Sequence, residues 1–322
     1  MKTIITLLFS FYSLTATAAT ILPSPLVETE WLSKNMNKVT ILDIRKDTKS
    51  FTGKPIFKKD KKTKKPKLSK VGGHIPGALL VNYKKVRVTR EISGKKVTRI
   101  VPTKLDFENF MQKVGLNKGD AIVIVSKGAS NADVTMASRL YWQLKYFGHE
   151  QIAILNGGMA QWIVDKRKIS RKSGKAKKGN WVATTQNEAI LATSKEVSNA
   201  VKAKNTQLVD TRTMSLYLGT WNKSYVYGKG HIPGAKVYPN ELMTTSKMPV
   251  KFITKSDTGK LFKAMNINTN SKTITYCNSG HLASGTWFLM HEVLGNKQVK
   301  LYDGSMHQWT LEKNPTTSMK ME

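Results

Sequence analysis

The chain has 322 residues, with 53 Lys and Arg against 21 Asp and Glu, and a single cysteine. This length suits two domains that each bury a core, and 40 % hydrophobic residues with seven Trp exclude an intrinsically disordered chain. One cysteine excludes a disulfide framework and a cysteine-rich zinc or iron–sulfur site, whereas the net charge of +32 by itself is typical of proteins that bind nucleic acid or anionic membranes.

The first residues have the pattern of a cleavable signal peptide. Lys2 precedes the apolar run Ile4–Leu14, and the small residues Ala16–Ala19 allow cleavage after Ala18 or Ala19. The run is too short for a membrane anchor, and no later stretch has the ~18 apolar residues that a spanning helix needs. We therefore expect residues 1–19 to be a signal peptide and the mature protein to be periplasmic. A buried N-terminal helix is the alternative.

The rest of the chain contains one pattern twice. Four landmarks recur in the same order, and the offset between copies shrinks from 167 residues (Asp43 to Asp210) to 147 (Trp162 to Trp309). The paired segments are Val39–Arg45 with Gln207–Arg212, Gly73–Ala78 with Gly230–Ala235, Ala121–Ser126 with Thr273–Cys277, and Leu155–Trp162 with Tyr302–Trp309. We expect two domains of one type, residues 20–165 and 181–322, joined by a basic linker, residues 166–180.

Each copy has the alternation of an α/β fold. The stretches Thr135–Phe147 and Ala283–Leu294 are periodically apolar and end at Gly148 and Gly295, as helices often do. Short β-branched runs between such stretches suit buried parallel strands. They are Val39–Leu42, Ala121–Val125, Gln151–Leu155, Gln207–Val209, Thr273–Tyr276 and Gln298–Leu301. The sequence predicts, in each domain, a mainly parallel sheet with helices on both faces.

Two basic segments carry almost half of the net charge. Lys58–Lys70 contains eight Lys and one Asp, and Lys166–Lys178 contains eight Lys and Arg, so together they contribute +15 of +32. Neither segment has periodic apolar residues, and we expect both to be solvated loops. No nucleic-acid motif accompanies them, and export argues against a nucleic-acid partner.

Cys277 lies at the end of a predicted strand, Thr273–Tyr276, and the loop Asn278–Leu282 separates it from a predicted helix. Loop amides and a helix N-terminus at the carboxyl edge of a parallel sheet favour a thiolate. Gly280 permits a tight turn in this loop. The matching position in the first copy is Ser126, so we expect a reactive thiol in the second copy only.

Taken together, these motifs resemble the tandem rhodanese-family sulfurtransferases. The resemblance extends from about Pro25 to Trp309 and implies two rhodanese-like domains, the first inactive and the second catalytic, with no cofactor. It implies that Cys277 takes a sulfane sulfur from a small anionic donor, thiosulfate or 3-mercaptopyruvate, as a persulfide. A thiol or cyanide would then accept the sulfur. The backbone amides that would stabilise the anion belong to Asn278, Ser279, Gly280, His281 and Leu282.

The chain departs from both types of enzyme in this family. Thiosulfate enzymes typically have cationic residues where Asn278 and Ser279 stand, and often an Arg where Leu216 stands. Mercaptopyruvate enzymes have Cys-Gly-Ser-Gly, of which Ser279 and Gly280 match two positions. By this second resemblance Ser279 and His74 are acid–base helpers, although His74 also suits a structural role in a turn. The donor stays open.

Three further groups near the predicted site have open roles. Asp210 and Arg212 are expected to form a structural ion pair at the strand end. Lys229 either attracts the anionic donor or is an ordinary surface lysine. His281 either carries a positive charge beside Cys277 and lowers the pKa of the thiol, or faces solvent. The six His lack ligand spacing with Cys277, so we expect no metal site.

The residues of the Cys277 loop also bear on two alternative functions. A phosphatase of this fold needs Cys-x5-Arg to clamp phosphate, and positions 283 and 284 are Ala and Ser. A non-enzymatic periplasmic sulfur carrier or thiol-redox module uses the same Cys277 loop and remains the alternative to an enzyme. The oligomeric state is left open.

Overall fold

Two five-stranded parallel sheets form the framework of the computed structural model, which describes residues 21–174 and 176–319. The first sheet has the order β1 (Leu26–Val27), β9 (Ile152–Leu155), β8 (Ile122–Val125), β2 (Thr40–Arg45), β5 (Leu79–Asn82). The second has the order β10 (Leu191–Ala192), β14 (Val299–Tyr302), β13 (Thr273–Tyr276), β11 (Gln207–Asp210), β12 (Lys236–Val237). The predicted repeat is confirmed, because the two orders correspond strand for strand. The predicted signal peptide, residues 1–19, lies outside the described residues and stays a prediction.

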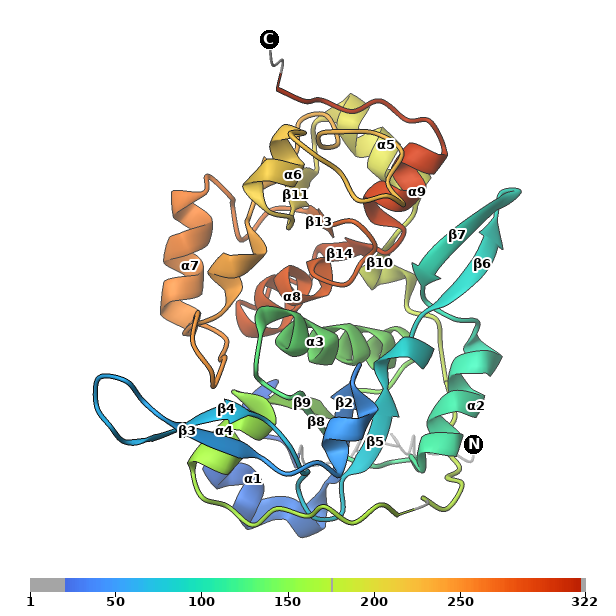
Figure 1. Ribbon diagram of the computed structural model, residues 1–322. Helices are drawn as coiled ribbons and strands as arrows, with labels where there is room; N and C mark the ends of the chain where they lie inside the picture. The colour runs from blue at the N-terminus through green and yellow to red at the C-terminus, as the bar shows by residue number, and fades with distance from the viewer. Residues whose placement is uncertain (1–20, 175, 320–322) are drawn as a thin grey trace, which may run out of the picture.

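The predicted helices also form, on both faces of each sheet (Figure 1). In the first unit, α1 (Thr29–Asn35) and α4 (Gly158–Val164) cover one face, and α2 (Lys104–Val114) and α3 (Asn131–Tyr146) cover the other. In the second unit, α5 (Ser194–Ala203) and α9 (Ser305–Leu311) lie opposite α7 (Lys255–Ala264) and α8 (Ala283–Trp287). The helix α6 (Met214–Leu218) follows β11, and α8 continues as a π-helix, Phe288–Val293.

Five short 3₁₀ helices connect these elements: Met36–Lys38, Thr48–Phe51, Tyr83–Lys85, Glu188–Ile190 and Asn240–Met243. As predicted, α3 and the helical stretch that starts with α8 are followed by Gly148 and Gly295. Both glycines have positive φ, +87° and +89°, the left-handed conformation that ends a helix at little cost.

The two units share one hydrophobic core. Helices α3 and α8 pack against each other between the sheets (Figure 1). The core cluster that contains Leu140 and Trp142 of α3 also contains Trp287 of α8 and strand residues of both sheets. Because each helix buries one side on its own sheet and another on its neighbour, the pair fixes the second unit against the first.

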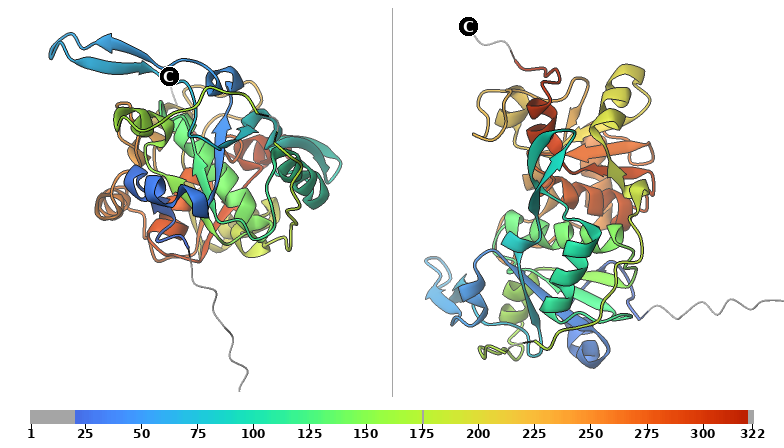
Figure 2. Two further views of the ribbon diagram at one scale, coloured as in Figure 1. Left: turned by 90° about the horizontal axis from the view of Figure 1, so that it is seen from below. Right: turned by 90° about the vertical axis from the view of Figure 1, so that its right-hand side faces the viewer.

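A hairpin of the first unit extends along the second. Strands β6 (Val88–Ile92) and β7 (Lys95–Ile100) pair antiparallel and lie beside α9 (Figure 2). The amide of Thr98 donates to Nε2 of His307 over 3.1 Å, and the guanidinium of Arg99 lies 3.9 Å from the ring centroid of Tyr225. This contact, like that of α3 with α8, joins the two units.

The prediction of a solvated loop at Lys58–Lys70 was wrong. Strands β3 (Ile56–Lys59) and β4 (Pro66–Lys70) form an antiparallel hairpin that projects from the first unit (Figures 1 and 2). The lysines are exposed, but Leu68 is buried in the core and anchors the hairpin. Asp60 accepts hydrogen bonds from the amides of Lys62 and Thr63 and so closes the turn. Backbone pairing and one buried side chain therefore suffice for a strand pair that has no apolar period.

The segment between the units lies on the first one. Ser170 pairs with His74 in an antiparallel bridge. Trp181, expected at the start of the second domain, is buried against Phe107 of α2 with a centroid distance of 5.7 Å. The boundary at residue 181 stays a prediction, and the second sheet begins at β10. None of the described helices is both long and apolar enough to cross a membrane.

Candidate active site

Cys277 directly follows β13 at the carboxyl edge of the second sheet. Asp210, the last residue of β11, is paired in register with Tyr276, so the ends of these neighbouring strands bring Asp210 beside the Cys277 loop. In the first sheet, Asp43 is paired in the same way with Val125, which precedes Ser126. The structure therefore places Ser126 where the repeat predicted it, at the position equivalent to Cys277.

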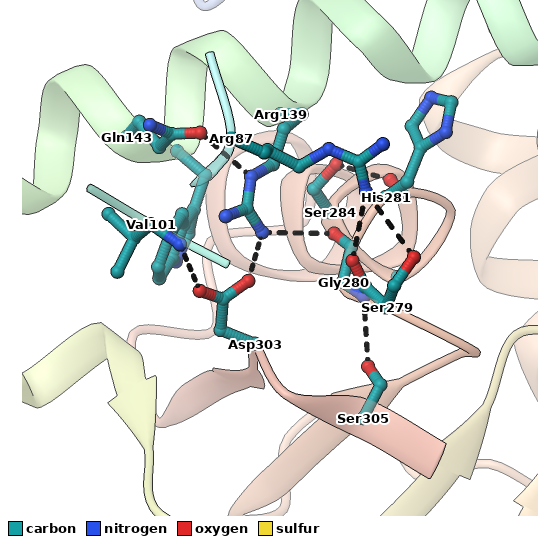
Figure 3. A network of polar contacts seen from close by, with 12 residues as sticks. Arg87, Val101, Arg139, Gln143, Ser279, Gly280, His281, Ser284, Asp303 and Ser305 are labelled. Carbon is teal, nitrogen blue, oxygen red and sulfur yellow. Dashed lines mark hydrogen bonds and ion pairs between the residues drawn. The ribbon is translucent and has the colours of Figure 1, made fainter. Parts of the chain in front are cut away.

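Ser305 anchors the Cys277 loop from the start of α9. Its Oγ accepts hydrogen bonds from the amides of Cys277, over 3.1 Å, and Gly280, over 3.0 Å, and donates to the carbonyl of Tyr302. The Gly280 amide is thus used to hold the loop (Figure 3). The Gly280 amide, predicted to stabilise the anion, donates to Ser305 in the structure, and its role toward the sulfur stays a prediction.

Four other amides of the loop keep their hydrogens free. Within the described part of the chain, the amides of Asn278, Ser279, His281 and Leu282 have no hydrogen-bond acceptor. Cys277 itself is 2 % exposed. Asn278 and Ser279 are buried, whereas His281 and Leu282 are partly exposed. Amides without protein acceptors can bind an anion, so these four are suited to stabilise a negative charge in the loop.

Gly280 is required for the tight turn of this loop. Its φ is +69°, and a Cβ there would lie 2.6 Å from Oδ1 of Asp303 and 2.7 Å from Nη1 of Arg139. A side chain would therefore be strained and would collide with a buried ion pair. The loop and the residues that pack on it form one interlocked unit.

Arg139 of α3 connects the first unit to this loop. Its Nη1 forms an ion pair with Oδ1 of Asp303 and donates to the carbonyl of Gly280 over 3.3 Å. The other carboxylate oxygen of Asp303 accepts from the amide of Val101 over 2.7 Å. The Arg139 side chain is fully buried, and Figure 3 shows its contacts with Asp303, Gly280 and Gln143. This buried network holds the loop from the side of the first unit.

Arg87, between the 3₁₀ helix Tyr83–Lys85 and β6, is a second arginine of the first unit on the loop. Its Nη1 donates to the carbonyl of Ser279 over 3.1 Å and lies 3.3 Å from Oγ of the same residue (Figure 3). Sequence reasoning missed both arginines, because they belong to the copy expected to be inactive. Ser305, although part of a repeated landmark, had been given no role.

His281 does not supply a positive charge. Its Nε2 lies 3.2 Å from the carbonyl of Ala132 and 3.1 Å from Oγ1 of Thr135, both in α3. Burial, reinforced by the charge of Arg87, lowers the pKa of His281 to about 3. The ring is therefore neutral at neutral pH and donates its Nε2 proton to the carbonyl, so the protonated role considered from the sequence does not apply.

Asp210 and Arg212 form the buried ion pair expected at the strand end. Nη2 of Arg212 lies 2.6 Å from Oδ2 of Asp210 and also donates to the carbonyl of Gly230. Burial alone would lower the pKa of Arg212, but the charge and hydrogen bonds of Asp210 raise it. Arg45 and Asp43 repeat the pair in the first unit, with a bond to Gly73. The presence of the pair in both units indicates a structural role.

Among the described residues, His74 and Lys229 form no hydrogen bond or ion pair with the Cys277 loop. Nδ1 of His74 is 2.8 Å from the carbonyl of Phe51, and the two rings stack. His231 stacks on Tyr217 in the same way in the second unit, which indicates a turn histidine in both. Lys229 is exposed. The roles suggested for His74 and Lys229 stay predictions, whereas Ser279 of the loop is the hydrogen-bond partner of Arg87.

The loop of the first unit lacks two groups. The carbonyl of Ser126 accepts from the amide of Met159, just as the carbonyl of Cys277 accepts from Met306. Gly158 stands where Ser305 stands in the second unit, and a Cβ on Gly158 would lie 2.3 Å from the carbonyl oxygen of Ser126. The loop of the first unit thus has Ser126 in place of the thiol, and Gly158 in place of the serine whose hydroxyl anchors the Cys277 loop.

A metal site needs several ligating side chains close together. Among residues 21–174 and 176–319, no group of three or more His, Cys, Asp or Glu side chains is placed to hold a metal ion.

Known proteins that resemble this chain cover most of it. A protein of Saccharopolyspora erythraea named "Putative thiosulfate sulfurtransferase" is 27 % identical over 293 residues, 88 % of this chain and 92 % of the relative. The "Sulfur carrier protein TtuD" of Thermus thermophilus is 24 % identical over 298 residues, 89 % of this chain and 94 % of that protein. The crystal structure of SseA from Escherichia coli, described among 3-mercaptopyruvate sulfotransferases, has a TM-score of 0.69 at 22 % identity. It covers 88 % of this chain and 98 % of SseA.

The family follows from the match to its domain model. The model described as the rhodanese-like domain matches residues 28–165 and, a second time, residues 193–312. These two segments contain the loops at Ser126 and Cys277 and all strands of the two parallel sheets except the edge strands β1 and β10, which lie just before them. The chain therefore belongs to the rhodanese-like family and contains the rhodanese-like domain twice.

Proposed function

We propose that the protein is a sulfurtransferase that carries sulfur as a persulfide on Cys277. The observation that carries the proposal is the single cysteine of the chain, buried in a loop where four backbone amides have no acceptor among the described residues. A thiolate or a persulfide anion on Cys277 would be a hydrogen-bond acceptor for those amides. The names of the relatives, which describe thiosulfate and 3-mercaptopyruvate enzymes, support the same reaction.

In the first half-reaction, the Cys277 thiolate attacks the outer sulfur of the donor. A bond forms between Sγ and that sulfur, and the bond to the rest of the donor breaks. The electron pair of the broken bond leaves with sulfite if the donor is thiosulfate. With 3-mercaptopyruvate it leaves as the enolate of pyruvate, which then takes up a proton. The free amides of the loop stabilise the persulfide anion that remains.

In the second half-reaction, a thiol or cyanide attacks the outer sulfur of the persulfide. The bond between the two sulfur atoms breaks, and its electron pair returns to Cys277 as the thiolate. Cyanide yields thiocyanate, and a thiolate yields a new persulfide. The loop has the same charge before and after the cycle, so the amides that Ser305 and the fold hold in place serve both steps.

Intact-mass measurement after incubation with each donor tests this proposal directly. We expect wild-type protein to gain about 32 Da, the mass of one sulfur atom, and Cys277→Ser to gain none. Excess cyanide should remove the added mass. If no donor of a sulfane sulfur adds this mass to the wild type, the proposal fails.

A sulfur carrier is the second candidate, since one relative is named a sulfur carrier protein. Both candidates form the Cys277 persulfide, but only an enzyme turns over with small molecules. Thiocyanate production with thiosulfate and cyanide separates them. Many equivalents per protein, lost in Cys277→Ser, indicate an enzyme, whereas about one equivalent indicates a carrier whose partner is missing.

A further inference from the structure

Three arginines surround the Cys277 loop, and one of them has no counter-charge. Arg212 is paired with Asp210, and Arg139 is paired with Asp303. Arg87 has no carboxylate within 4.0 Å among the described residues. Arg87 is partly exposed and its Nε is buried, so an anion that reaches this side chain meets a positive charge that no carboxylate neutralises.

The guanidinium of Arg87 also has one complete edge free. Nη1 is used by Ser279, but Nε is buried without a hydrogen-bond partner, and Nη2 has no acceptor in the described part of the chain. Nε and Nη2 are parallel donors that together fit two oxygens of one anion. Arg45 uses this same edge on the carboxylate of Asp43, over 2.6 and 2.7 Å.

Tyr83 adds another unused donor at the same place. Its ring lies 4.9 Å from the Arg87 guanidinium and 5.0 Å from the ring of His281. Its hydroxyl is buried and has no partner. Burial raises the pKa of Tyr83 to about 12, so the hydroxyl keeps its proton at neutral pH. Arg87 and Tyr83, both of the first unit, thus lie in contact and each keeps a hydrogen-bond donor without a partner.

We propose that the Nε–Nη2 edge of Arg87, assisted by the Tyr83 hydroxyl, binds the oxoanion group of the sulfur donor. That group is the carboxylate of a mercapto acid or the oxygens of thiosulfate. The inference rests on the proposed function and assigns donor binding to the domain without the cysteine. It also explains why the loop needs no cation at Asn278 or Ser279, since the first unit supplies one from outside.

Alkylation of Cys277 tests donor binding independently of sulfur transfer. Iodoacetate carries a carboxylate, whereas iodoacetamide has the same size and no charge. With either reagent, a carbon–sulfur bond forms, the carbon–iodine bond breaks and iodide leaves. Because the chain has a single cysteine, the added mass reports on Cys277 alone. Comparing the two rates cancels any change in the reactivity of the thiol itself.

The variants are Arg87→Gln, Arg87→Lys and, as the matched control, Lys84→Gln. Lys84 is exposed, lies three residues from Arg87 and has no ion pair with a described residue. We expect Arg87→Gln to lower the ratio of the iodoacetate rate to the iodoacetamide rate by about ten-fold, and Arg87→Lys to lower it less. An unchanged ratio in Arg87→Gln, or an equal fall in Lys84→Gln, would overturn the proposal.

Donor titrations then identify which oxoanion Arg87 binds. In Arg87→Gln, the donor concentration for half-maximal persulfide formation should rise about ten-fold, while loading at saturation is retained. A rise for 3-mercaptopyruvate alone assigns the carboxylate, and a rise for thiosulfate alone assigns the thiosulfate oxygens. If the alkylation ratio falls but no donor loads the wild type, Arg87 binds an anion and the proposed sulfur transfer fails. A half-maximal concentration that changes for neither donor, while both load the protein, contradicts donor binding by Arg87.

Discussion

Ser305 shows at the scale of one residue how the two units differ. One oxygen atom accepts from two amides of the Cys277 loop and fixes the turn on which the thiol lies. The first unit has Gly158 at this place and Ser126 at the place of the thiol, and its backbone would not admit a Cβ at Gly158. The first unit therefore lacks the anchor as well as the nucleophile.

His281 provides a residue-scale prediction about pH. The pKa of histidine is near 6.5 in an unfolded chain, and burial lowers that of His281 to about 3 in the fold. Between these values the unfolded chain binds more protons, so the free energy of unfolding falls as the pH decreases below about 6.5. Between about pH 7.5 and pH 5, we expect the free energy of unfolding of His281→Gln to fall by about 1–2 kcal/mol less than that of the wild type, as measured by urea unfolding.

The variant should keep part of the pH dependence. Burial also lowers the pKa of His149 and His307, and these two histidines remain in His281→Gln. The informative quantity is hence the difference between the two proteins. Equal losses of stability in both would show that His281 is protonated in the fold or exposed to the same degree as in the unfolded chain.

The basic hairpin β3–β4 illustrates how an element can be separate from the site. It is attached to the first core through Leu68, and no described contact joins its lysines to the Cys277 loop. The second basic segment, Lys166–Lys178, lies on the first unit near His74. The described Lys side chains of both segments are exposed, so their charges act on a small donor only through screened, long-range attraction.

We therefore predict that replacing the Lys and Arg residues of both basic segments by Gln leaves turnover largely intact. At physiological salt, kcat/KM for a small donor should change by no more than about two-fold, as measured by steady-state kinetics. An unchanged thermal unfolding midpoint would show that the variant is folded. A severe loss of kcat/KM in a folded variant would instead place these lysines in donor capture.

The buried ion pair between Arg139 and Asp303 connects the two units of the molecule. It links α3 of the first unit to the segment between β14 and α9 of the second, and both side chains are at least nine-tenths buried. Arg139 also donates to Gly280 of the loop. The same contact thus joins the units and shapes the site. The domain without the thiol therefore contributes to the structure of the Cys277 loop.

Removing one partner of this pair should be costly. We expect Arg139→Gln to lower the free energy of unfolding by about 3–5 kcal/mol, because the Asp303 carboxylate is left buried without its counter-charge. The double variant Arg139→Gln with Asp303→Asn removes that charge and should recover part of the loss. Urea unfolding measures both. A cost below about 1 kcal/mol for Arg139→Gln, or no recovery in the double variant, would contradict this account.

The duplicated α/β fold and the place of Cys277 could be predicted from local patterns in the chain. Strands, helix ends and the Cys277 loop depend on residues that are neighbours in the chain, so patterns such as Thr273–Tyr276 followed by Cys277 predict them. The hairpin at Lys58–Lys70 was missed because backbone pairing leaves little trace in side-chain pattern.

The surroundings of the thiol depend on contacts between residues that are far apart in the chain. Arg87 and Ser279 are 192 positions apart in the chain, and Arg139 and Gly280 are 141 apart. Their contacts exist because α3 and α8 share one core and bring the first unit over the loop of the second. No spacing within either copy encodes that packing, so the candidate donor-binding arginine was found only where the two copies meet.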